Sequence, residues 1–75
     1  MGNKIKELEA LTEGRRKFLS GLLGIFAAKG TISKEIREGL KGISRYFGIR
    51  GYNFSNLKDI KECYHDFTRL QEGEY

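Results

Sequence analysis

The sequence contains no proline and no tryptophan, and it has one cysteine and one histidine among its 75 residues. A lone cysteine cannot close an internal disulfide, so nothing points to an oxidising compartment and we expect a cytoplasmic protein. With no second histidine or cysteine, a zinc site lacks its ligands. The absence of proline and the small number of β-branched residues other than isoleucine favour helices over strands. We therefore expect one all-α domain over residues 1–75.

Long apolar runs are also scarce, and only residues 15–28 are apolar enough for a core helix. The run is too short to span a bilayer, which needs about 20 residues. At ~100° per residue its large side chains share one broad side, which we expect to be buried: Phe18, Leu19, Leu22, Leu23, Ile25 and Phe26. On the opposite side Ser20, Gly24 and Ala28 repeat every fourth residue, and small residues at this spacing allow close backbone approach. We expect this surface to contact a neighbouring helix or a second chain in a homodimer.

The pattern predicts a small bundle of three main helices, residues 13–28, 33–47 and 55–72, with a short extra helix in residues 1–11. The second main helix has a regular apolar stripe: Ile36, Leu40, Ile43 and Phe47. Ser55 is predicted to cap the last helix. Gly39 and Gly42 are costly inside a helix, by about 1 kcal/mol each relative to alanine, so we expect them to contact the surface formed by Ser20, Gly24 and Ala28.

A row of cations follows the second main helix on the side away from its apolar stripe: Lys34, Arg37, Lys41 and Arg45. Like charges four residues apart repel by roughly 0.2–0.5 kcal/mol in an isolated helix, and bound phosphates would relieve that repulsion. Arg50 and Tyr52 follow in the next loop, where the tyrosine is placed to stack on a base. We favour a small nucleic-acid-binding regulatory or accessory protein, with an ordinary solvated helix face as the alternative.

The tract FAAKGTISKEIREGL resembles helix-turn-helix segments in outline. The resemblance implies that residues 29–32 form the turn and that Ser33, Lys34 and Arg37 face the groove of DNA. Two helices joined by any glycine turn give a similar pattern, so a plain helical hairpin is the alternative. The size and composition suit a phage, plasmid or viral accessory protein.

Two other classes of function stay open. A protein–protein interaction module, such as a small inhibitor or adaptor, would use an exposed aromatic residue such as Tyr46 or Tyr52. A peripheral membrane protein would use Arg15, Arg16 and Lys17 ahead of the apolar run. Residues 14–20 are also similar to a twin-arginine export signal, and the first four residues begin like a myristoylation signal.

Catalytic constellations are missing from the sequence. Cys63 and His65 are two residues apart on an expected helix, so they point in different directions. We expect Cys63 to be a small core residue. The tract KGTISKEI is similar to the second half of an EF-hand loop, but its ligand positions carry no carboxylate, so we predict no calcium site. We expect no enzyme activity, no metal and no cofactor.

Overall fold

The structure is a computed structural model that describes residues 3–73, which form four helices and no strand. The helices are α1 (Asn3–Glu9), α2 (Glu13–Lys29), α3 (Lys34–Phe47) and α4 (Leu57–Gln71). The predicted all-α bundle is confirmed, and the ends of the three main helices fall within two residues of the predicted ones. The myristoylation-like start at Met1 and Gly2 lies outside the described residues.

Local side chains explain where α2 and α3 begin and end. The hydroxyl groups of Thr12 and Ser33 each accept a hydrogen bond from the first turn of the helix that follows, at 3.3 and 3.2 Å. Gly30 and Gly48 end α2 and α3 with φ angles of 77° and 78°, a left-handed conformation that favours glycine.

The prediction that Ser55 caps α4 is wrong. Asn56 occupies the cap position, and its side-chain oxygen accepts a hydrogen bond from Lys58 N at 2.9 Å. The amide N–H of Ser55 instead donates to the side chain of Asn53, in a turn that brings the chain round into α4. Asparagine is as good a cap as serine, so composition alone does not choose between the two neighbours.

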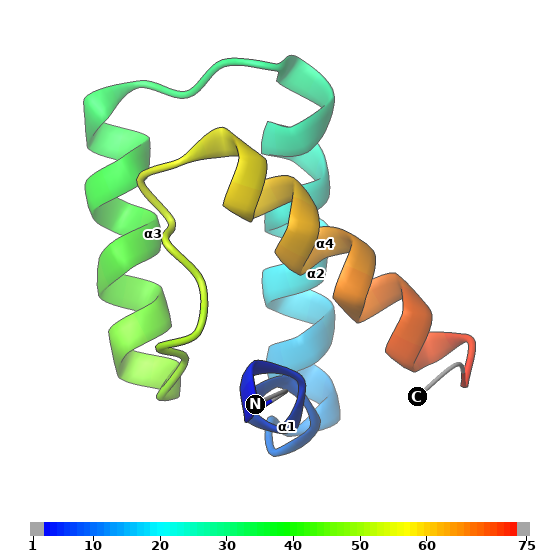
Figure 1. The fold of residues 1–75 in the computed structure, drawn as a ribbon. Helices are drawn as coiled ribbons and strands as arrows, with labels where there is room; N and C mark the ends of the chain where they lie inside the picture. The colour runs from blue at the N-terminus through cyan, green and yellow to red at the C-terminus, as the bar shows by residue number, and fades with distance from the viewer. Residues whose placement is uncertain (1–2, 74–75) are drawn as a thin grey trace.

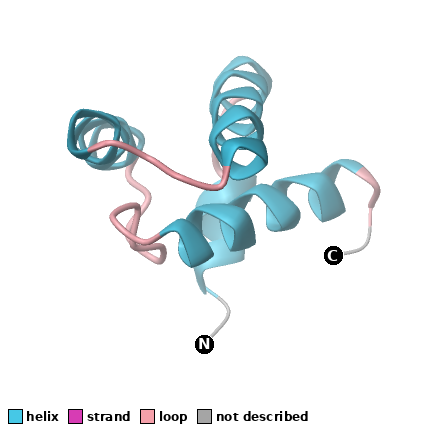
Figure 2. Ribbon diagram, turned by 90° about the horizontal axis from the view of Figure 1, so that it is seen from above, coloured by secondary structure: helices cyan, strands magenta, loops and turns pink. Residues whose placement is uncertain are grey.

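The helices have unequal partners (Figure 1). α4 crosses α2 closely, and α1 lies beneath the start of α2 and touches α4. α3 runs beside α2 in the opposite direction, with the loop of residues 48–56 passing between α3 and α4. Seen from above, α3 stands to one side of the pair formed by α2 and α4 (Figure 2).

The part of the small-residue side of α2 around Gly24 is covered by α4, whereas Ala28 is exposed. A Cβ atom on Gly24 would lie 2.9 Å from the ring of Tyr64, so this glycine is needed for the close approach. The expected contact of Gly39 and Gly42 with this surface is therefore wrong, because nothing lies within 4 Å of a Cβ at either residue. For the same reason, the surface around Gly24 is not free for a homodimer.

The core draws on all four helices and on the loop between α3 and α4. Its buried hydrophobic residues are Leu8, Leu11, Leu19, Leu23, Leu40, Ile49, Tyr52, Phe54, Ile60, Cys63 and Phe67. Cys63 is a small core residue, as predicted. Three of these residues, Ile49, Tyr52 and Phe54, belong to the loop and were not predicted to be buried. The loop passes between α3 and α4, so its side chains fill the space between these two helices.

Two residues of the predicted core face of α2 lie outside the core. Leu19 and Leu23 are fully buried, but Phe18 and Ile25 are 56% and 55% exposed. α3 lies beside α2 and does not cover all of the apolar side of α2, so Phe18 and Ile25 remain more than half exposed. The expectation that the whole apolar side of α2 is buried is therefore wrong.

α1 fastens the loop to the rest of the chain. The Glu7 carboxylate accepts hydrogen bonds from the backbone N–H groups of Arg50 and Gly51, at 3.0 and 2.9 Å. Lys4 forms an ion pair with Glu62 of α4, at 2.7 Å. A side chain on Gly51 would overlap Lys4, so only glycine lets the loop come this close to α1.

Candidate nucleic-acid interface

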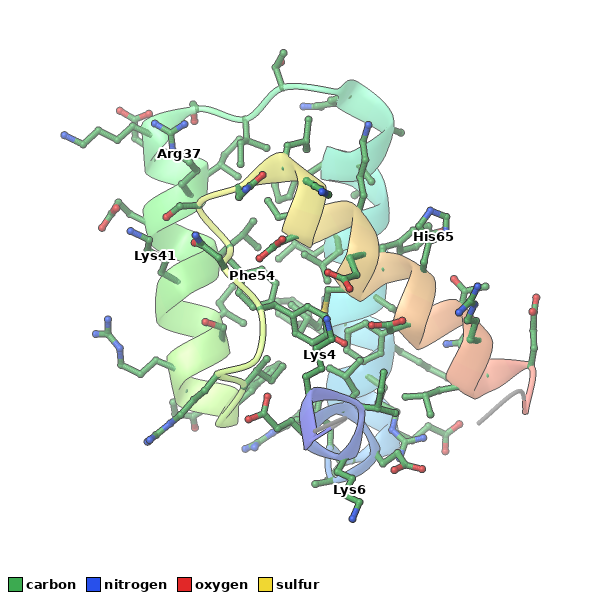
Figure 3. All side chains as sticks on the ribbon, viewed as in Figure 1. Lys4, Lys6, Arg37, Lys41, Phe54 and His65 are labelled. Atoms are coloured by element: carbon green, nitrogen blue, oxygen red, sulfur yellow. The ribbon has the colours of Figure 1, made fainter. Side chains whose placement is uncertain are left out.

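α3 presents a row of four cations along its outer side, which we call the basic ridge: Lys34, Arg37, Lys41 and Arg45. Leu40 is buried on the inner side of α3, so the cations on the opposite side of the helix face solvent. Lys34, Lys41 and Arg45 are exposed and Arg37 is half-buried. Figure 3 shows Arg37 and Lys41 on successive turns of the helix.

The loop adds Arg50 to one end of the ridge. Lys41, Arg45 and Arg50 line an open hollow of about 320 Å³, whose remaining lining is Ser44 and Ile49. We call this the basic hollow. The backbone N–H of Arg50 is bonded to Glu7, so α1 fixes the position of the loop at the hollow. The structure thus brings together three of the predicted site residues.

Few acids face these cations. Glu38 lies 3.5 Å from the Lys41 ammonium, and both side chains are largely exposed. Exposed pairs of this kind stabilise by about 0.2–1 kcal/mol, so a phosphate can compete for the lysine. Within residues 3–73, no ion pair involves Lys34, Arg37, Arg45 or Arg50. The ridge therefore keeps most of its positive charge available.

Tyr52 does not have the predicted role. It is 6% exposed, and its hydroxyl donates a 2.6 Å hydrogen bond to the Asp66 carboxylate. Burial, and then this hydrogen bond, raise the pKa of the Tyr52 hydroxyl. The ring lies against Phe54, and the Lys4 ammonium sits 5.0 Å from its centroid. A base has no open ring face on which to stack, so Tyr52 is a core residue.

The segment that resembles a helix-turn-helix forms a hairpin of α2 and α3. Ser33 caps α3, and both Ser33 and Lys34 are exposed at its start. The two helices run in opposite directions on either side of the short turn at Gly30 (Figure 1). Insertion of the start of α3 into a DNA groove stays a prediction.

The rest of the described chain offers no metal centre. Residues 3–73 contain no group of three or more His, Cys, Asp or Glu side chains placed to hold a metal ion. Burial, with Asp66 nearby, raises the pKa of the Cys63 thiol, which keeps it protonated and unreactive. None of the described helices combines the length and the apolar character needed to cross a bilayer.

Sequence reasoning missed a second surface, on the other side of the hairpin. The Arg15 guanidinium lies over the rings of Tyr46 and Phe47, 5.5 and 5.0 Å from their centroids, and Phe18 meets Phe47 edge to face. Tyr46 is 76% exposed. The repeat of glycine and large apolar residues along both helices is the signal that could have located this surface. Searches with this chain against protein-family profiles, curated proteins and solved structures find no match.

Proposed function

We propose that the chain binds nucleic acid through phosphate contacts made by the basic ridge and Arg50, as a small regulatory or accessory protein. The observation that carries the proposal is the basic hollow, where Lys41, Arg45 and Arg50 converge. Among residues 3–73, Glu38 is the one acid that forms an ion pair with any of the three. Three convergent cations suit an oxyanion with several acceptor atoms, such as a backbone phosphate.

The length of the ridge also supports this proposal. From Lys34 to Arg45 the ridge spans about 17 Å along α3, at 1.5 Å per residue. The major groove of B-form DNA is about 12 Å wide, so cations along one helix can reach the phosphates on both of its edges. Phosphate contacts fix position without reading bases, so we expect little sequence preference.

Salt-dependent binding tests this proposal. Fluorescence anisotropy with a labelled duplex of about 20 base pairs, from about 50 to about 300 mM salt, gives the dependence of affinity on salt. Each phosphate contact contributes about 0.9 to the slope of log affinity against log salt. The Arg45→Ala/Arg50→Ala double variant should lower that slope by about 2, because both arginines are exposed and support no buried group.

The matched control removes two cations from another helix. Lys58 and Lys61 are exposed on α4, so Lys58→Ala/Lys61→Ala removes the same charge away from the ridge. This control should keep the wild-type slope. No binding at low salt, or equal losses in both double variants, would contradict the proposal. Binding that does not fall as salt rises would contradict it as well, because phosphate contacts lose affinity as salt increases.

A further inference from the structure

Two exposed stripes run along the hairpin formed by α2 and α3, on a different face from the one that carries the basic ridge. The members follow one another at alternating intervals of four and three residues, which is the spacing of a coiled-coil contact. All of them are exposed. We call the two stripes together the glycine seam: Gly14, Phe18, Gly21, Ile25 and Ala28 on α2, and Glu35, Gly39, Gly42 and Tyr46 on α3.

The glycines of this seam have no partner within the described chain. A Cβ atom at Gly14, Gly21, Gly39 or Gly42 would meet nothing within 4 Å, in contrast to Gly24 under Tyr64. Glycine is the poorest helix former after proline, so these helices are weakened for no internal gain. Close packing of a helix from another chain against the seam would explain why glycines occur at these positions.

Large apolar side chains alternate with the glycines. Phe18, Ile25 and Tyr46 are 56%, 55% and 76% exposed. Between the two stripes lies a groove of about 150 Å³ with almost no polar surface. The groove is lined by Leu22, Phe26, Ile36, Gly39, Leu40 and Ile43.

We propose that the glycine seam is the interface with a second copy of this chain, in which two hairpins pack face to face. The seam is complementary to itself, because each stripe holds both large residues and the glycine gaps that receive them. In a two-fold contact the same patch serves both partners, which requires this property. A lipid surface would gain nothing from the glycine gaps.

Charge also favours a second copy in antiparallel orientation. Glu35 is the one member of the seam that is charged at neutral pH, and it lies at the start of α3. Arg15 lies at the opposite end, over the Tyr46 ring. Antiparallel packing brings Glu35 of one copy toward Arg15 of the other at both ends of the interface, and no like charges meet along the seam.

The exposed area is of the right order for such a contact. Taking roughly 150–250 Å² for a complete aromatic side chain, Phe18 and Tyr46 alone expose about 200–330 Å². A standard interface buries about 800 Å² per partner. The groove side chains and the open glycine backbone lie beside them and can supply the remainder.

Most of the basic ridge stays free in this arrangement. Around α3, Lys41 lies roughly 100° or more from every seam residue of the helix, and Arg45 lies roughly 100° or more from Gly39 and Tyr46 and about 60° from Gly42. The dimer therefore does not depend on the nucleic-acid proposal, and it is tested without nucleic acid.

Sedimentation equilibrium of the full chain measures the mass directly. From about 10 μM to about 1 mM, the range in which weak association becomes populated, the mass should rise to twice the 8.6 kDa of one chain. Ile25→Glu should remain a monomer throughout with wild-type helicity, because Ile25 is half exposed and lies outside the core. The control Gln71→Glu adds the same charge to exposed α4 and should dimerise as wild type does.

Gly42→Leu distinguishes an effect on dimerisation from an effect on the stability of α3. Leucine is a better helix former and has open space here, so the variant should melt at a higher temperature as a monomer. In the dimer the new side chain fills a gap needed by the second copy, so dimerisation should weaken at least tenfold.

Three results would overturn the proposal. The first is a wild-type mass of one chain at every concentration. The second is a dimer that survives both Ile25→Glu and Gly42→Leu. The third is a monomer that floats with vesicles of anionic phospholipid and loses this binding in Ile25→Glu, which would assign the surface to a membrane.

Discussion

The Tyr52 hydroxyl donates a 2.6 Å hydrogen bond to the Asp66 carboxylate, joining the loop before α4 to the interior face of α4. Both residues are buried, at 6% and 7% exposed. A hydrogen bond to a carboxylate is about twice as strong as one between neutral groups. The loop that carries Arg50 is thus part of the core, and its position is set by this bond and by Glu7.

Removing the hydroxyl should destabilise the fold. We expect Tyr52→Phe to lower the free energy of unfolding by about 1–3 kcal/mol, because Asp66 stays buried with one donor fewer. Urea denaturation followed by circular dichroism measures the change. Tyr46→Phe is the control, since this ring is exposed, and it should change stability by less than about 0.5 kcal/mol. Equal effects in the two variants would contradict the assigned role of the bond.

Alkaline pH should weaken the fold through the same residue. The pKa of Tyr52 is raised above its usual 10.0 and that of Cys63 above its usual 9.0, both chiefly by burial. Above these values the unfolded chain loses protons that the folded chain still holds. Each group therefore lowers the free energy of unfolding by up to about 1.4 kcal/mol per pH unit.

The pH effect can be assigned with variants. Unfolding free energies measured between about pH 8 and pH 11 should fall steeply in wild type and less steeply in Tyr52→Phe/Cys63→Ala. The single variant Cys63→Ala should remove the part that begins near pH 9, because that group titrates first in the unfolded chain. Parallel curves for wild type and the double variant would show that other groups cause the loss.

Gly51 should tolerate no side chain. A Cβ atom there overlaps Lys4, and the Lys4 Cα lies 3.1 Å away, so α1 must move. We expect Gly51→Ala to cost about 1–3 kcal/mol, as overpacking usually does. Gly14→Ala meets open space and should be neutral or stabilising. Thermal melts of the two variants give the comparison, and equal melting temperatures would contradict a close contact between α1 and the loop.

The position of Tyr52 also makes a prediction about binding. Because its ring is buried, Tyr52→Phe should bind a labelled duplex with wild-type affinity under conditions where the protein is folded. A stacking residue would lose about 1–3 kcal/mol of binding when its ring is removed by alanine, but here Tyr52→Ala would unfold the loop first. Anisotropy titrations compare the folded Tyr52→Phe variant with wild type, and weaker binding by the variant would show that the Tyr52 hydroxyl contacts the duplex rather than Asp66 alone.

The helices were predictable because periodicity and capping are local. Thr12 and Ser33 begin α2 and α3, and Gly30 and Gly48 end them, close to the predicted bounds of residues 13–28 and 33–47. Periodicity shows that a face is apolar, but it does not say which element covers it. Gly24 faces α4 rather than α3, and this choice depends on how the chain returns after residue 56.

The candidate site was predictable in part for the same reason. The cations of the basic ridge lie on the side of α3 opposite the buried Leu40, so helical spacing was sufficient to predict their exposure. Loop residues have no repeating pattern, and the inward position of Tyr52 depends on Asp66, which is 14 residues later. The approach of Arg50 to Lys41 likewise depends on the contact of the loop with Glu7 on α1, a long-range contact that local spacing does not encode.

The detached position of α3 has a consequence for motion. α2 and α4 pack closely, whereas α3 is held by side chains such as Leu40, by the Phe47–Phe18 contact and by the loop. Elements with fewer tight contacts open at lower free energy, so α3 amide hydrogens should exchange with deuterium before those of α2. The helix that carries the cations should then open more often than α2. A polyanion that bridged several turns of α3 would reduce this opening, and the conformational entropy that α3 loses would lower the net affinity.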